Sequence, residues 1–317
     1  MPTSSYYRRV LAAYLGRGRS HLSFWHEKPA VNERAFEKDS IEYYMTFAEK
    51  ARYAGPFDDQ GIPQLDYRGA IGRRYNPIAI AQYGLACFNY WKHAEFLNCA
   101  DWLVRNLKPN SHGVPVWMHE FDWEYFRTLR APWYSGLAQG QGVSLLLRAH
   151  RATEDTKYMN AAQEAFASLL KPVEDGGVLL MDPSGHGWIE EYITEPPTHI
   201  LNGFLWALWG VWDWLRFVET KGPARELWEK SLATLEQNLP RFDAGYWSLY
   251  DLAPVGRKNV ASLFYHRLHI VQLDVMYRLS GREVFRAFRD RWQGYADSAF
   301  KRHRAWLAKV MFKLTYY

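Results

Sequence analysis

The sequence contains very little cysteine. Its 317 residues include two, Cys87 and Cys99, and each lies in an apolar helical pattern without a Cys-x-x-Cys pair or a histidine at metal-ligand spacing. This spacing argues against a zinc site and against a disulfide framework. We therefore expect two buried thiols and no metal.

Long hydrophobic runs are absent as well. No apolar stretch is long enough to cross a bilayer. The run over residues 10–16 follows Arg8 and Arg9, but it is too short for a secretory signal and is followed by Arg17 and Arg19. We expect a cytoplasmic protein, and a peripheral membrane contact through this basic amphipathic start is the alternative that stays open.

Runs of charge of one sign are also missing. Lys and Arg total 39 against 34 Asp and Glu, which gives a net charge of +5, and the basic residues are scattered along the chain. A modest positive charge favours anionic partners. Because no basic run or nucleic-acid motif accompanies it, we expect no nucleic-acid partner. An acidic polysaccharide, a membrane surface and an ordinary solvated basic face stay open on charge alone.

Aromatic residues are abundant. They make up 17% of the chain, with 15 Trp and 21 Tyr, and the hydrophobic share of 48% is ample for a large core. Buried aromatics commonly dominate core packing, and this is the ordinary explanation for any one of them. Aromatic faces also form platforms for sugar rings, so the composition fits a carbohydrate-active protein too.

Helical periodicity recurs along the chain. It predicts helices over residues 32–53, 77–92, 94–107, 135–153, 156–170, 198–220, 223–239, 262–279 and 282–296. Turns at Gly61, Gly113, Gly176 and Gly245 introduce short extended pieces between helix pairs. A repeated unit of this kind buries its apolar face by stacking on its neighbours. We predict a mainly α fold: an incomplete (α/α) barrel or toroid over residues 32–317, with its short β-hairpins gathered at one rim, after an irregular segment over residues 1–31.

One polar loop stands out from this pattern. Residues 187–197 place Trp188, Glu190, Glu191 and Tyr192 between glycine and prolines, and a helix restarts directly afterwards. A concentration of polar groups at the end of an apolar helix indicates a functional site on a rigid scaffold. We expect one of the two glutamates to be structural.

Five stretches together resemble the D-glucuronyl C5-epimerase family. They are residues 75–85, 101–106, 133–141, the loop 187–204, and the pair Tyr250-Asp251-Leu252 and Tyr265-His266. The resemblance implies inversion at C5 of a hexuronate within a polysaccharide, D-glucuronate to L-iduronate, without a metal or other cofactor. It also implies that Tyr250, Tyr265 and Glu191 are the acid/base residues and that Tyr192 lies beside the substrate.

The chemistry can be stated independently of the resemblance. A C5 proton lies α to a carboxylate and is very weakly acidic, so the enzyme must stabilise an enolate-like intermediate and exchange protons on opposite faces. A phenol has an ordinary pKa near 10, so a tyrosinate base needs a cationic neighbour. The local candidates are His266, Arg267, His269, Arg257 and Lys258.

The chain departs from the family pattern in two places. Animal members carry an arginine directly after Tyr-Asp-Leu that helps to hold the uronate, whereas this chain has Ala253. We expect Arg267 or Arg257 to bind the carboxylate instead, and Arg267 is favoured because it lies close to Tyr265. Animal members also carry β-sheet material before the motif at residues 75–85 and between it and the motif at residues 101–106. In this chain only residues 86–100 separate these two motifs.

Further residues are candidates for contacts with the sugar. Tyr75, Gln82 and Arg73 lie at the opening of the second helix and could bind flanking sugars, although packing or capping explains them equally well. His119 belongs to the second hairpin, and His266 adjoins Tyr265.

Two other functions remain open at this point. A uronate polysaccharide lyase begins with the same proton abstraction, and helical toroids also carry lyases and glycosidases, so fold alone cannot separate them. A non-catalytic acidic-glycan-binding protein is the alternative from another class. The expected partner is an anionic uronate-containing polysaccharide, heparosan-like or of another kind, and a homodimer is left open.

Overall fold

The protein is mainly helical, as the sequence predicts. The structure is a computed structural model and describes residues 21–316. Its helices are α2 His21–Trp25, α3 Pro77–Asn89, α4 His93–Asn106, α5 Gly136–Thr153, α6 Thr156–Leu170, α7 Leu201–Phe217, α8 Pro223–Asn238, α9 Leu263–Ser280, α10 Glu283–Asp297 and α11 Ala299–Tyr316. No helix among the described residues is long and apolar enough to cross a membrane. The basic start of the chain around Arg8 lies outside these residues.

Local signals explain where several helices begin and end. The Asn76 side chain accepts hydrogen bonds from the backbone N–H groups of residues 78 and 79, and Pro77 occupies the first helical position of α3. Ser262 caps α9 by accepting from the Tyr265 N–H. The same helix ends at Gly281, whose φ of 69° favours glycine.

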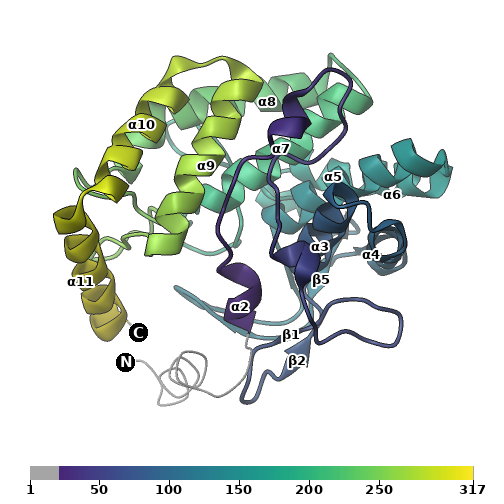
Figure 1. Ribbon diagram of the computed structural model, residues 1–317, viewed down its shortest axis with the longest axis horizontal. Helices are drawn as coiled ribbons and strands as arrows, with labels where there is room; N and C mark the ends of the chain where they lie inside the picture. The colour runs from purple at the N-terminus through teal and green to yellow at the C-terminus, as the bar shows by residue number, and fades with distance from the viewer. Residues whose placement is uncertain (1–20, 317) are drawn as a thin grey trace.

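The long helices form two rows. In one row α3 packs on α5, α5 on α7 and α7 on α9, while α4, α6, α8 and α10 pack against them in turn. Figure 1 shows this arrangement as an arc around α2, with α11 at one end and α4 near the other. Glycine allows the close crossing of α5 and α7, since a Cβ at Gly140 would lie 2.5 Å from the Cα of Ala207.

Short antiparallel pairs connect the helices. They are β1 Leu65–Asp66 with β2 Arg73–Arg74, β3 Lys108–Pro109 with β4 Pro115–Val116, β5 Met118–His119 with β8 Trp133–Tyr134, β6 Trp123–Glu124 with β7 Thr128–Leu129, and β9 Leu179–Met181 with β10 Gly187–Ile189. Turns are present at Gly61, Gly113, Gly176 and Gly245, as predicted. The pairs β5–β8 and β6–β7, one nested inside the other, were not predicted.

The helix predicted over residues 32–53 is wrong. This segment contains two short 3₁₀ turns, Glu33–Phe36 and Lys50–Arg52, and the rest is largely irregular. Tyr44 is buried and donates a hydrogen bond to Asp213 Oδ1 at 2.5 Å, beside an ion pair in which Arg148 Nη1 lies 2.6 Å from Asp213 Oδ2. The apolar side chains thus pack against α5 and α7 from an irregular backbone, and these contacts outweigh the local periodicity. The other predicted helices are confirmed to within three residues at each end.

The two cysteines are buried free thiols, as predicted. Burial raises the pKa of Cys87 to about 12 and that of Cys99 well above its ordinary value. Both thiols are therefore protonated at neutral pH and serve as core residues.

Candidate active site

Glu190 and Glu191 follow β10 but face different surroundings. The Glu190 carboxylate lies 2.5 Å from His199 Nδ1, and the His199 ring stacks on Trp188 with 4.2 Å between ring centroids. Glu190 also accepts a hydrogen bond from the His199 N–H. It is therefore the glutamate that holds the loop on the body of the protein.

Glu191 lies against the first turn of α7. Asn202 Nδ2 donates to Glu191 Oε2 at 3.4 Å, and a Cβ at Gly203 would lie 2.1 Å from the same oxygen. The Asn-Gly pair of the loop motif thus makes room for the carboxyl group and binds it. Burial raises the Glu191 pKa to about 8, partly opposed by a hydrogen bond with Tyr192 and reinforced by the charges of Glu190 and Asp251.

Tyr250 and Tyr265 approach each other from neighbouring elements. Tyr250 belongs to an extended piece whose backbone N–H donates to the Asn259 carbonyl at 2.8 Å. Tyr265 lies in the first turn of α9. The two rings meet edge to face, with centroids 4.8 Å apart and planes at 69°. Burial, together with nearby Glu191, raises the pKa of Tyr250 well above its ordinary value, so its phenol is a proton donor in the resting state.

A cavity of about 260 Å³ brings these residues together. Glu191, Tyr192, Tyr250 and Tyr265 all line it, although they come from two stretches far apart in the sequence. Its walls are rich in aromatic rings, namely Tyr67, Phe121, Trp123, Trp133 and Trp206. The cavity therefore combines the carboxyl groups of Glu191 and Glu124 with the phenols of Tyr192, Tyr250 and Tyr265 and with apolar ring faces.

A hydrogen-bond network stabilises one side of the cavity. Asp251 Oδ2 accepts from the Tyr125 hydroxyl at 2.5 Å and from Asn259 Nδ2 at 2.6 Å. Asn259 Oδ1 in turn accepts from Lys309 Nζ at 2.7 Å. This network joins β6–β7, the Tyr250 loop and α11, and its members Tyr125, Asn259 and Lys309 were missed in the sequence.

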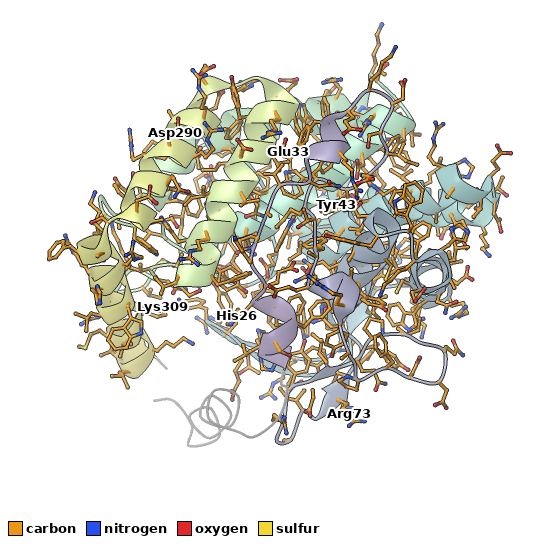
Figure 2. All side chains as sticks on the ribbon, in the orientation of Figure 1. His26, Glu33, Tyr43, Arg73, Asp290 and Lys309 are labelled. Atoms are coloured by element: carbon orange, nitrogen blue, oxygen red, sulfur yellow. The ribbon has the colours of Figure 1, made fainter. Side chains whose placement is uncertain are left out.

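Lys309 and Lys313, one turn apart on α11, also line the cavity. Lys309 Nζ lies 5.6 Å from the centroid of the Tyr250 ring. Burial, with a smaller contribution from the charge of Lys313, lowers the Lys309 pKa to about 7, and Asp251 opposes the shift. Figure 2 shows Lys309 on the side of α11 that faces α2 and His26. His26 is another lining residue, and burial lowers its pKa to about 4, with contributions from Lys313 and Lys50.

The two arginines expected at the carboxylate do not line the cavity. Arg257 and Arg267 are both exposed. His266 is buried behind the site, where its ring stacks on Trp247 at 3.6 Å and its Nδ1 lies 2.8 Å from Ser248 Oγ. The structure therefore does not bring these three predicted residues to Tyr250.

The remaining predicted contact residues also lie outside the cavity lining. Gln82 is buried and donates to Gln141 Oε1 at 3.0 Å, and Tyr75 donates to Asp58 Oδ2 at 2.7 Å. His119 is buried and stacks on Trp133, a wall residue, with centroids 3.8 Å apart. Arg73 lies on β2, far from Lys309 and His26 in the view of Figure 2. Of the predicted contact residues, Tyr192 alone is among the described lining residues.

Glu191 and the neighbouring phenols around one partly enclosed cavity define a site suited to acid–base chemistry. The family model of the D-glucuronyl C5-epimerase C-terminus matches residues 109–294, and the chain belongs to this family. Glu191, Tyr250 and Tyr265 lie inside the matched range, and α11, which carries Lys309 and Lys313, lies beyond it.

Two relatives extend this comparison. The chain is 34% identical over 222 residues to D-glucuronyl C5-epimerase of Caenorhabditis elegans. The matched stretch covers 66% of this chain and 36% of the relative. It is 31% identical over 183 residues to an uncharacterised protein of Methanocaldococcus jannaschii, covering 56% of this chain and 57% of the relative. The chain thus spans about a third of the length of the first relative and somewhat more than half of the second.

Proposed function

We propose that this protein is a C5-epimerase that converts D-glucuronate residues of a polysaccharide to L-iduronate. One observation carries the proposal: Glu191, Tyr250 and Tyr265 line one cavity. Family membership over residues 109–294 supports the same reaction class. The aromatic walls give sugar rings apolar faces on which to stack.

In the proposed reaction Glu191 removes the C5 proton. Its carboxyl pKa of about 8 is nearer to neutrality than the pKa of Tyr250, which lies well above the ordinary phenol value. This matches a group that must both accept and release a proton. The C5–H bond breaks, the proton passes to a Glu191 oxygen, and the electron pair enters the substrate carboxylate to form an enolate-like dianion.

Reprotonation then comes from the opposite face. A phenol O–H of Tyr250 or Tyr265 breaks and its proton forms the new C5–H bond, while the electron pair of the enolate returns to C5. The resulting tyrosinate regains a proton from solvent, and Glu191 releases its own through Tyr192 or to water. Because the incoming proton comes from an exchangeable hydroxyl, each inversion in heavy water leaves deuterium at C5.

We also propose that the two rows of helices form an incomplete (α/α) barrel whose hairpins share the rim that carries the site. The successive packing of α3, α5, α7 and α9 supports this arrangement. Residues from the loop after β10, from the β6 hairpin and from the piece before α9 all reach the cavity, as a shared rim requires.

The test is incubation with uronate polymers in heavy water. A panel with heparosan, other D-glucuronate polymers and a neutral glucan is examined by proton NMR for loss of the C5 signal and for new L-iduronate resonances. Exchange on a uronate polymer, with none on the glucan, is the expected result. Absorbance from an unsaturated uronate would identify a lyase, new reducing ends would identify a hydrolase, and binding without exchange would favour a glycan-binding protein.

A further inference from the structure

The cavity contains two lysines whose role the acid–base residues do not explain. Lys309 and Lys313 come from α11, outside the part of the chain that matches the family model. Like charges in one partly enclosed site repel each other, and Lys313 indeed lowers the pKa of Lys309. Such an arrangement is favourable when an anion occupies the space between them and the facing wall.

Lys309 is well placed to bind that anion. Its ammonium donates to a neutral acceptor, Asn259 Oδ1, at 2.7 Å, and it forms no ion pair with any residue in the range 21–316. An ammonium carries three N–H donors, so donors remain for an acceptor in the cavity. Lys309 Nζ also lies 5.6 Å from the centre of the Tyr250 ring, beside a proposed proton donor.

The position of a uronate carboxylate is constrained by its own chemistry. This group is bonded directly to C5, so its cationic partner must lie next to the residues that exchange the C5 proton. Ala253 has no polar side chain for this purpose, and Arg257 and Arg267 are exposed outside the cavity lining. Among described residues, Lys309 and Lys313 are the Lys or Arg side chains in that lining.

We propose that Lys309, assisted by Lys313, binds the uronate carboxylate and stabilises the negative charge that develops on it when the C5 proton leaves. This inference rests on the proposed function for its catalytic part. An ammonium beside the carboxylate makes the C5 proton more acidic, because the extra electron pair of the enolate-like intermediate resides largely on the two carboxylate oxygens.

The experiment compares a uronate polymer with its carboxyl-reduced form, in which each uronate is a neutral hexose. The polymer is heparosan, or whichever member of the panel shows C5 exchange. Binding of both forms is measured by calorimetry in the Tyr250→Phe background, which separates binding from turnover. Exchange rates are measured in the otherwise wild-type protein carrying Lys309→Met, Lys313→Met, both changes, or Lys309→Arg.

Lys301→Met is the matched control. Lys301 lies on the same helix, with Nζ 4.2 Å from the centroid of the Tyr295 ring, and it does not line the cavity. We expect Lys309→Met to lower kcat/KM by at least about 30-fold and to remove the preference for the uronate polymer over its reduced form. Lys309→Arg should recover part of this preference, while Lys301→Met should behave like the wild type.

The outcomes separate the inference from the proposed function. If the wild type exchanges C5 and the double lysine variant keeps both kcat/KM and the preference, the lysine assignment is overturned and the epimerase stands. If no polymer is exchanged but the preference depends on Lys309, the carboxylate site stands and the epimerase is wrong. Absence of both exchange and preference removes both proposals. Thermal unfolding of each variant shows whether it is folded.

Discussion

Gly203 and Glu191 are in such close contact that a single methyl group would not fit between them. A Cβ built at Gly203 would lie 2.1 Å from Glu191 Oε2 and 2.5 Å from Glu191 Cβ. The glycine in the first turn of α7 therefore sets the position of the carboxyl group. Its role is steric, because its backbone lies within an ordinary helix.

Gly203→Ala should consequently displace Glu191 and reduce C5 exchange by at least about 100-fold, since displacements of about 1 Å can have effects of this size. Overpacking should also lower the free energy of unfolding by about 1–3 kcal/mol. The control is Gly294→Ala in α10, where a Cβ meets nothing within 4 Å, and where about 0.5–1 kcal/mol of added stability is expected. Wild-type exchange in Gly203→Ala would exclude the proposed position of Glu191.

The phenol pair provides a second prediction. Tyr250→Phe and Tyr265→Phe should each reduce exchange by more than about 1000-fold if the missing hydroxyl carries the proton, while the edge-to-face ring contact persists. Deuterium incorporation and circular dichroism measure the two properties. Tyr246→Phe is a suitable control, because that ring lies outside the cavity lining and packs on Arg304. A phenylalanine variant with normal exchange would remove that tyrosine from the mechanism.

The adjacent glutamates should respond in opposite ways. Glu191→Gln removes the proposed base and should abolish exchange with little change in stability. Glu190→Gln breaks a buried pair with His199, so it should lower the free energy of unfolding by about 1–3 kcal/mol and reduce exchange less. Denaturant unfolding and exchange rates, measured on the same preparations, check both. Equal loss of exchange in two equally stable variants would contradict this division of roles.

The helices could be predicted because their signals are local. Asn76 followed by Pro77, and Ser262 before an apolar run, determine helix starts without distant contacts. Glu191, Tyr250 and Tyr265 could be proposed because each lies in a recognisable motif. Residues 32–53 could not be predicted correctly, since their aromatic side chains pack on α5 and α7, which come much later in the chain.

The residue proposed to bind the substrate carboxylate could not be predicted from the sequence for a different reason. Arg267 is close to Tyr265 in sequence, but two positions along an α-helix correspond to a rotation of roughly 200°, which directs the two side chains to opposite faces. Lys309 reaches Tyr250, and Lys313 reaches the same cavity, from a helix that was not predicted. Proximity of that kind arises from tertiary packing, which no local pattern in α11 reports.

The exposed arginines therefore provide a fourth prediction. Arg267→Ala and Arg257→Ala should leave kcat/KM within about twofold of the wild type, because surface charges away from a site affect binding weakly. Initial rates at low polymer concentration give the measurement, and Lys309→Met assayed in parallel shows that a loss can be detected. A loss of at least about tenfold in either arginine variant would return the carboxylate contact to that arginine.

The last prediction concerns pH. In the proposed reaction Lys309 must be protonated to bind the carboxylate and Glu191 must be ionised to accept the C5 proton. The Lys309 pKa is about 7 and the Glu191 pKa is about 8, so a single proton shared by the two groups lies mostly on Glu191. The active form, with that proton on Lys309, is therefore the less populated of the two singly protonated forms. The charged neighbours that contribute to these values are Lys313, Glu190 and Asp251.

Consequently kcat/KM should rise through about pH 7 and fall through about pH 8. The two apparent pKa values of this profile belong to Lys309 and Glu191 as a pair and not to either residue alone. Tyr250 and Tyr192 do not contribute in this range, since the pKa of each lies well above the ordinary phenol value. Lys309→Met removes the group whose deprotonation lowers the activity of the enzyme. The residual kcat/KM of this variant should therefore rise through about pH 8 to a plateau. Exchange rates from about pH 5 to about pH 10 distinguish the two profiles. An alkaline fall that persists in Lys309→Met would show that another group, and not this lysine, must stay protonated.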